Sequence, residues 1–230
     1  MFKVYLVGGA VRDKFLGVQS KDLDFIVMAQ SFDEMKGFLL AQGCKIFVEK
    51  PEYLTIRANH PVWGAVDFAC PRTDGNYTDG RRPDSTSIAD TLEADLERRD
   101  FTCNAIAQDM ETGDIIDPFN GRADIESRKL RCVNSARARF HEDKLRAFRA
   151  LRFAITKGFH LDVEISNAIG SLTVASFQNV ASERIREELL KMFKVNWLRS
   201  TRLLTEFPHG VLLEVINERG IWFVPTLSRI

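Results

Sequence analysis

Short stretches of alternating apolar and polar residues occupy residues 1–120, a pattern typical of strands joined by turns and short helices. Val4–Val7 is an apolar run that ends at Gly8-Gly9, and a helical stretch follows through Leu16. The spacing of Ser31 and Glu34 is that of a capping box, which predicts the start of a helix. Further strands are predicted at Leu23–Val27, Tyr53–Ile56, Val66–Ala69, Ile106–Met110 and Ile115–Asp117, the last two around a hairpin turn.

A helical period replaces this pattern after Gly121. Apolar positions predict a helix from about Glu142 to Lys157, a second after Asp162 and a third over Ser182–Lys194. We therefore predict an α/β part in residues 1–120 and a helical part in residues 121–230. The polar segment Thr73–Ser87 contains glycine, proline and charges, and is predicted to be a mobile loop.

The charges balance, with 32 Lys and Arg against 32 Asp and Glu, so a nucleic-acid partner has to be met by a local basic surface. No apolar run approaches the roughly 18–20 residues that span a bilayer, and we expect no membrane partner. The four cysteines include no C-x-x-C pair, and the histidines have no zinc-ligand spacing. Reduced thiols in the cytoplasm are the expectation from this usage.

Two glycines and two carboxylates near the start of the chain form the first candidate site. Gly8 and Gly9 lie between a strand and a helix start, where backbone N–H groups and the helix dipole attract phosphate. Asp22 and Asp24 are two apart on a strand and point to one face, and hard carboxylate oxygens suit Mg²⁺. Two Mg²⁺ ions there could activate a 3′-hydroxyl and stabilise a leaving pyrophosphate. Each motif alone is more often a tight turn or a solvated strand face, but the combination is more specific.

Other polar residues lie in or beside the later predicted strands. Asp67 is either a third carboxylate of the metal site or an edge-strand acid that faces solvent, and the sequence favours neither. Arg99 can pair with triphosphate oxygens, because a guanidinium matches the geometry of phosphate. Asp100 and Asn104 offer an acceptor and an amide to ribose hydroxyls. In isolation, Arg98–Ala105 is a charged turn before a strand, and its chemistry alone is not specific to one function.

The helix predicted from Glu142 carries a row of charges, since Asp143 and Arg146 are i,i+3 neighbours and Arg149 and Arg152 continue the same side. The simple interpretation is a surface ion pair with solvated arginines. The functional one is base selection: a carboxylate accepts from the amino group of cytosine or adenine, and a guanidinium donates to the ring nitrogen. Uracil and guanine reverse both contacts and would be rejected because buried polar groups would stay unpaired.

Residues 121–160 are locally basic, which makes this region a candidate surface for RNA phosphates. The cations are Arg122, Arg128, Lys129, Arg131, Arg137, Arg139, Lys144, Arg146, Arg149, Arg152 and Lys157.

In this order, the motifs closely resemble those of class II tRNA nucleotidyltransferases (CCA-adding enzymes) and the related bacterial poly(A) polymerases. The resemblance runs from Met1 to about Lys194. Its motifs are Tyr5–Asp13 with Asp22-Leu23-Asp24, Arg72–Asp84 leading to Asp95-Leu96, Arg99–Ala105, Asp117–Gly121 with Leu130-Arg131, Glu142–Arg152 and Glu183–Leu189.

The resemblance implies a nucleotidyltransferase-type sheet with flanking helices in the head, residues 1–120, and an all-helical neck with a short, truncated body in residues 121–230. It implies Asp22 and Asp24 as metal ligands, and Gly9 and Arg12 as nucleotide contacts. The expected activity is addition of C, A or both from CTP and ATP to the 3′ acceptor end of tRNA, with Mg²⁺ and without a nucleic-acid template.

Two departures from the family pattern affect these expectations. Lys144 follows Asp143 where the family often has proline, and we expect a small effect. Family members commonly have longer body and tail domains that hold tRNA, and an oligomer is one hypothesis for how the missing surface is supplied. Alternative functions are poly(A) polymerase, a transferase that acts on a small molecule or protein, and a non-catalytic nucleotide-responsive RNA-binding module; the last is disfavoured by the presence of Asp22, Asp24 and Arg99.

Overall fold

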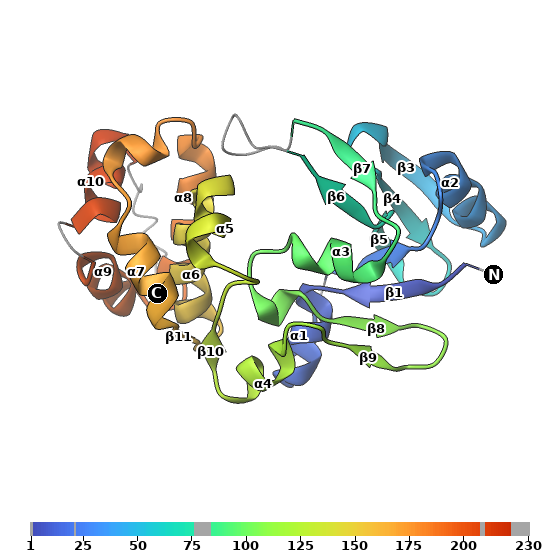
Figure 1. Cartoon of the computed structure of the whole chain (residues 1–230), viewed down its shortest axis with the longest axis horizontal. Coiled ribbons are helices and arrows are strands. Elements are labelled where there is room, and N and C mark those ends of the chain that lie inside the picture. The colour runs from blue at the N-terminus through green and yellow to red at the C-terminus, as the bar shows by residue number, and fades with distance from the viewer. Residues whose placement is uncertain (1, 21, 76–83, 208–209, 222–230) are drawn as a thin grey trace, which may run out of the picture.

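The computed structural model describes residues 2–20, 22–75, 84–207 and 210–221. A seven-stranded mixed sheet with the order β3-β4-β5-β2-β1-β8-β9 forms one end of the molecule, and helices form the other (Figure 1). This arrangement confirms the predicted fold class. The strands of the sheet are β1 (Val4–Val7), β2 (Asp24–Val27), β3 (Lys45–Lys50), β4 (Thr55–His60), β5 (Gly64–Ala69), β8 (Ala107–Asp109) and β9 (Ile115–Ile116).

The register of β2 with its neighbours positions the acidic residues. Strand β2 is antiparallel to β1 and parallel to β5, and Asp24 lies directly opposite Asp67 in the parallel pair. Paired residues of adjacent strands lie on one face of a sheet, so both carboxylates share a face. Because β5 lies between β4 and β2, the alternative that Asp67 belongs to an edge strand is wrong.

Short helices connect the strands: α1 (Gly9–Phe15), α2 (Phe32–Ala41) and α3 (Leu92–Glu97), together with the 3₁₀ turns η1 (Pro51–Tyr53) and η2 (Thr102–Asn104). The predicted cap is confirmed, since the Ser31 hydroxyl accepts from the Glu34 N–H. The predicted strand at Tyr53 starts later, at Thr55, because Pro51 opens a 3₁₀ turn.

Both ends of the predicted loop Thr73–Ser87 are ordered. They belong to a two-stranded sheet of β6 (Arg72–Asp74) and β7 (Thr86–Ile88), because these strands pair antiparallel. The middle of the predicted loop, residues 76–83, lies outside the described residues.

The helical part begins with α4 (Gly121–Glu126) and the parallel pair β10 (Lys129–Leu130) and β11 (His160–Leu161). Its remaining elements are α5 (Ala136–Glu142), α6 (Leu145–Thr156), α7 (Val163–Gly170), the 3₁₀ helix η3 (Val174–Phe177), α8 (Ser182–Phe193), α9 (Trp197–Thr205) and α10 (Val211–Glu218).

The prediction of one helix from Glu142 to Lys157 is wrong at its start. Asp143 is extended, with φ −139° and ψ 107°, and separates α5 from α6. Its side chain explains the break, because the carboxylate accepts from the N–H of Leu145 at the start of the next helix.

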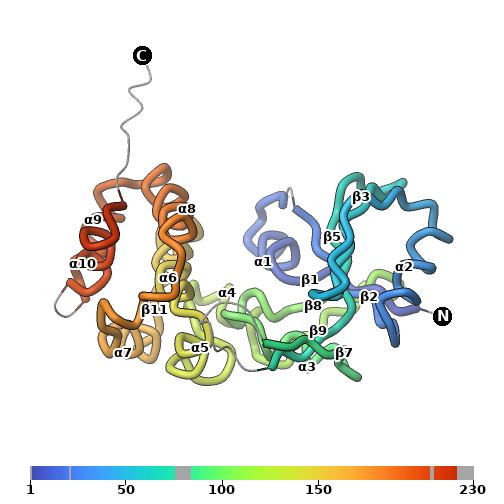
Figure 2. The backbone as a smooth tube through the Cα atoms, turned by 90° about the horizontal axis from the view of Figure 1, so that it is seen from above, coloured from blue at the N-terminus to red at the C-terminus, as the bar shows by residue number. Residues whose placement is uncertain are grey.

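The apolar cores show how the two ends of the molecule meet. One core packs α2 against the sheet through buried residues such as Met35, Leu39 and Phe68. Another includes Val11 and Phe101 from the α/β end together with the buried faces of the helices. Helices α6 and α8 stand next to each other in both views of the chain (Figures 1 and 2). Within the described residues, no helix has the length and apolar character needed to cross a membrane.

Candidate active site

A cavity of about 750 Å³ lies between the sheet and the helical part. The structure brings together every residue that the sequence singles out as a site residue. Its walls include Gly8, Gly9, Arg12, Asp22, Asp24, Asp67, Arg99, Asp100, Asn104, Asp143, Arg146, Arg149 and Arg152.

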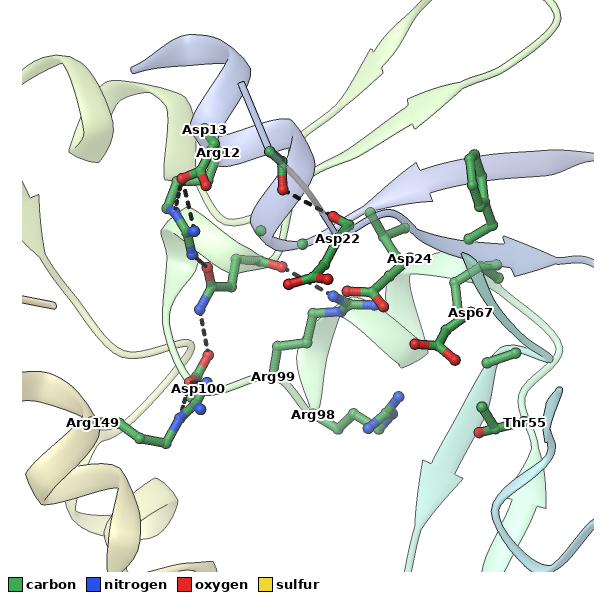
Figure 3. Close-up of a pocket in the computed structure, with 18 of the residues that line it drawn as sticks. Arg12, Asp13, Asp22, Asp24, Thr55, Asp67, Arg98, Arg99, Asp100 and Arg149 are labelled. Carbon is green, nitrogen blue, oxygen red and sulfur yellow. Dashed lines mark hydrogen bonds and ion pairs between the residues drawn. The ribbon is translucent and has the colours of Figure 1, made fainter. Parts of the chain in front are cut away.

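Asp22, Asp24 and Asp67 lie side by side and form an acidic wall of the cavity (Figure 3). Asp24 and Asp67 belong to β2 and β5, but β2 begins at Asp24, so Asp22 lies just before the strand and not on it as predicted. Loss of water in the cavity raises the pKa of the Asp24 carboxyl, and the charges of Asp67 and Asp22 raise it further against the opposing Arg99 and Arg57. Asp67 is partly neutralised by Arg57, at 3.6 Å between Nη1 and Oδ2. The pair Asp22 and Asp24 is therefore short of positive charge.

A divalent cation fits this wall by charge and donor type, because Mg²⁺ is commonly held by one or two carboxylates together with water and substrate phosphates. The described residues contain no group of three or more His, Cys, Asp and Glu side chains arranged to hold a metal ion. Metal binding by Asp22 and Asp24, with or without Asp67, therefore stays a prediction.

The turn after β1 has a conformation that requires glycine. Gly8 has φ +69° and ψ −128°, and a Cβ atom there would lie 2.8 Å from Nη1 of Arg99. The missing side chain lets the guanidinium lie directly over the turn. Figure 3 shows Arg99 beside the carboxylates of Asp22 and Asp24, so the predicted phosphate-binding groups and the acidic wall face the same space.

Arg12, Asn104, Asp100 and Arg149 form one continuous chain of hydrogen bonds (Figure 3). Arg12 Nη1 donates to Asn104 Oδ1 at 2.5 Å, and Asn104 Nδ2 donates to Asp100 Oδ1 at 2.9 Å. Arg149 then donates to Asp100 Oδ2 through Nε and Nη2, at 2.8 and 2.5 Å. Asp100 and Asn104 are buried and bonded to each other, so their contact with ribose stays a prediction.

The ion pair decides the charge state of Asp100. Burial alone would raise the pKa of this carboxyl, but Arg149, the Asn104 amide and Arg146 outweigh burial and hold the pKa well below its usual range. Asp100 is therefore a permanent anion that joins the sheet end of the chain to α6.

The predicted pairing of Asp143 with Arg146 is not present. Asp143 Oδ2 instead lies 3.0 Å from Nη2 of Arg184 on α8, and Arg146 pairs with Glu142 at 2.7 Å. Both side chains nevertheless line the cavity, which leaves them placed to meet a base. Their role as a base-selecting pair stays a prediction.

Sequence reasoning places Asp95, Arg184 and Glu188 in family motifs but misses that they pair with the charged side chains of the cavity. Glu188 is buried on α8 and pairs with Arg152. A signal was present, since Glu188 lies three residues after Ile185 and next to Leu189, on the apolar side of its helix. A charge on a buried helix face indicates a partner.

The basic region of residues 121–160 is less open to RNA than its sequence suggests. Most of its cations have acidic partners in the chain, such as Arg131 with Asp124 and Lys157 with Asp13. Arg137 is exposed and forms no ion pair among the described residues.

Comparison with known proteins places these features in a family context. The sequence model described as "Poly A polymerase head domain" matches residues 4–131. The CCA-adding enzyme of Geobacillus thermodenitrificans (strain NG80-2) is 36% identical over 228 residues, covering 96% of this chain and 53% of that enzyme. The CCA-adding enzyme of Listeria monocytogenes serotype 4b (strain CLIP80459) is 38% identical over 193 residues, covering 84% and 47%.

Solved structures of CCA-adding enzymes also resemble this chain. The Bacillus stearothermophilus CCA-adding enzyme in complex with CTP matches with a TM-score of 0.77 and 35% identity, over 90% of this chain and 48% of that one. The Thermotoga maritima CCA-adding enzyme complexed with tRNA matches with a TM-score of 0.74 and 25% identity, over 97% and 50%. The chain spans about half the length of these relatives.

Proposed function

The chain belongs to the family of class II CCA-adding enzymes and bacterial poly(A) polymerases, and from this premise we propose that it adds C, A or both from CTP and ATP to the 3′ end of tRNA without a nucleic-acid template. One observation carries the proposal: a single cavity contains an acidic wall, a glycine turn beneath an arginine, and the Asp143 and Arg146 side chains. These are the groups needed for a metal, a triphosphate and a base.

Residues 1–120 serve in this proposal as the catalytic head, and residues 121–230 as a helical neck and body that select the base and bind RNA. Gly8, Gly9, Arg12 and Arg99 receive the triphosphate, because backbone N–H groups and guanidinium groups donate to phosphate oxygens. We place the activity in the cytoplasm, where the four free and buried cysteines would stay reduced.

Nucleotidyltransferases of this family generally use divalent metal ions. We propose Mg²⁺ at Asp22 and Asp24, with two ions at the site. The bound metal would supply positive charge to the triphosphate and to the attacking oxygen. The protein's own part is to orient the nucleotide and to hold the two carboxylates side by side at the start of β2.

We assign base selection to α6 and to Asp143 and Arg146 at its start. The Asp143 carboxylate accepts from the amino group of cytosine or adenine, and the Arg146 guanidinium donates to the ring nitrogen. Arg149 and Arg152 complete this side of the cavity, while Asp100 and Asn104 face the ribose.

The test is incubation of the purified chain and Mg²⁺ with tRNA that lacks CCA, ends in C or ends in CC, with each NTP alone and in mixtures. Products are read at single-nucleotide resolution. Addition that stops after CCA, or at a defined part of it, is the expected result. Absence of product on every acceptor would refute the proposal.

Poly(A) polymerase activity is the second candidate, because the matching family model is described as a poly(A) polymerase head. The same cavity serves both activities. A long homogeneous A tail in the experiment above would assign this activity and overturn CCA addition.

A further inference from the structure

Asp95 is the most deeply buried carboxylate next to the cavity, and it contacts two of the arginines that line the cavity. Its side chain is 0% exposed on α3. Oδ2 accepts from Nε and Nη2 of Arg99 at 3.3 and 3.0 Å, and Oδ1 accepts from Nε and Nη2 of Arg98 at 3.0 and 2.7 Å. One carboxylate thus holds two guanidinium groups, each through a two-pronged contact.

These contacts determine which hydrogen-bond donors Arg99 has left for a ligand. Its Nη1 also donates to the backbone oxygen of Asn104 at 3.3 Å, so the guanidinium is fixed on two sides. Of its five N–H bonds, three are used by partners in the described part of the chain, which leaves one on Nη1 and one on Nη2 for a ligand. Gly8 leaves room for this position, because any Cβ there would collide with Nη1.

The acidic wall competes for the same guanidinium. Arg99 lies beside Asp22 and Asp24 in Figure 3, yet among the described residues its ion pair is with Asp95 and with neither of these two. An arginine without its buried counter-charge would move toward the nearest unpaired carboxylates, because opposite charges in a partly desolvated cavity attract strongly.

We propose that Asp95 is a positioning residue that holds Arg99 over the Gly8 turn and away from Asp22 and Asp24, so that its free N–H groups point at the incoming triphosphate. This inference rests on the proposed function only in identifying the triphosphate as the ligand. The lowered pKa of Asp95, where burial is outweighed by Arg98 and Arg99, agrees with a permanent anion at this position.

The test compares Asp95→Asn with Glu93→Gln, which removes the same charge from an exposed position of the same helix. Equilibrium binding of CTP and ATP is measured by calorimetry without RNA. We expect binding about tenfold weaker in Asp95→Asn and unchanged in Glu93→Gln, a size typical of coupled residues in one hydrogen-bond network. The melting temperature of each variant shows that it is folded.

A double variant separates positioning from a general structural role. If Asp95 acts through Arg99, then Asp95→Asn adds no further loss of affinity to Arg99→Ala. Additive losses, or wild-type affinity in a folded Asp95→Asn chain, would overturn the inference.

A readout that does not depend on nucleotide binding distinguishes failure of this inference from failure of the proposed function. The Nε–H resonance of Arg99 in a nitrogen–proton NMR spectrum should be protected from exchange in the wild type and in Glu93→Gln, and lose protection in Asp95→Asn. If the Arg99 Nε–H stays protected in Asp95→Asn, then Asp95 does not hold Arg99 in place. This conclusion does not depend on which ligand the chain binds.

Discussion

At the scale of single residues, Asp24 illustrates a conflict between the function of the site and the stability of the fold. It stands between two other carboxylates, and burial and those neighbours raise its pKa. A raised pKa in the folded chain means that the folded state binds the proton more tightly than the unfolded state. Stability therefore falls as the pH rises above the ordinary aspartate value of 3.8 and the carboxyl ionises.

Asp24→Asn should accordingly abolish nucleotide incorporation and, at neutral pH without metal, raise the melting temperature. The rise should be about 1–2 °C, since water screens a carboxylate at a cavity wall. It should shrink as the pH is lowered toward the aspartate range, where the wild-type carboxyl becomes protonated. Thermal unfolding followed by circular dichroism at both pH values checks this, and a lower melting temperature at neutral pH would contradict it.

At the scale of elements, the junction of α5 and α6 has backbone angles that suit proline. Lys144 has φ −62°, Asp143 before it is extended, and the Lys144 N–H donates no hydrogen bond within the described part of the chain. Proline fixes φ near this value and favours an extended residue before it. The lysine found here in place of the proline common in the family is therefore tolerated without a change of path.

Lys144→Pro should stabilise the chain by about 0.4–1 kcal/mol, because proline restricts the unfolded state at a position whose angles it already satisfies. Lys144→Ala is the matched control, since it removes the same side chain and keeps the N–H. Chemical denaturation of the three proteins measures the difference. A proline variant less stable than the alanine variant would show that the junction needs the N–H.

The elements that local pattern predicts correctly have strong local signals: the glycine turn after β1, the Ser31 cap and the hairpin of β8 and β9. Strand β3 was not predicted, because its side chains are mostly exposed and it is defined by pairing with β4. The site residues were found through motifs, but their partners were not. Arg149 and Asp100 are 49 positions apart, and nothing local in the sequence indicates that they bind each other.

At the scale of the whole molecule, the Asp100–Arg149 pair joins the sheet end to the helical end across the cavity. Because the pKa of Asp100 is depressed, the pair stabilises the fold at and above the ordinary aspartate pKa, and its contribution is lost as the pH falls through the depressed value. The pair thus helps to hold the two ends together throughout the neutral range.

Arg149→Met should lower the free energy of unfolding by about 2 kcal/mol, less than for a fully buried pair because the arginine is partly exposed. The loss comes mainly from leaving the buried Asp100 carboxylate without a partner. Adding Asp100→Asn to Arg149→Met should therefore restore part of the stability. Calorimetric unfolding of both variants provides the measurement. A double variant that is less stable than Arg149→Met would show that the unpaired Asp100 carboxylate does not cause the loss of stability.

All four cysteine side chains are buried, and burial raises the pKa of Cys70 to about 11 and, with nearby Asp100, that of Cys132 to about 12. Electrophilic dyes, which thiolates attack, should therefore react slowly with the unaltered chain. Cysteines introduced at exposed Lys45 on β3 and exposed Arg137 on α5 would be the fast-reacting positions. Fluorescence energy transfer between dyes at these two positions would then show, in single molecules, whether the cavity narrows when a nucleotide binds.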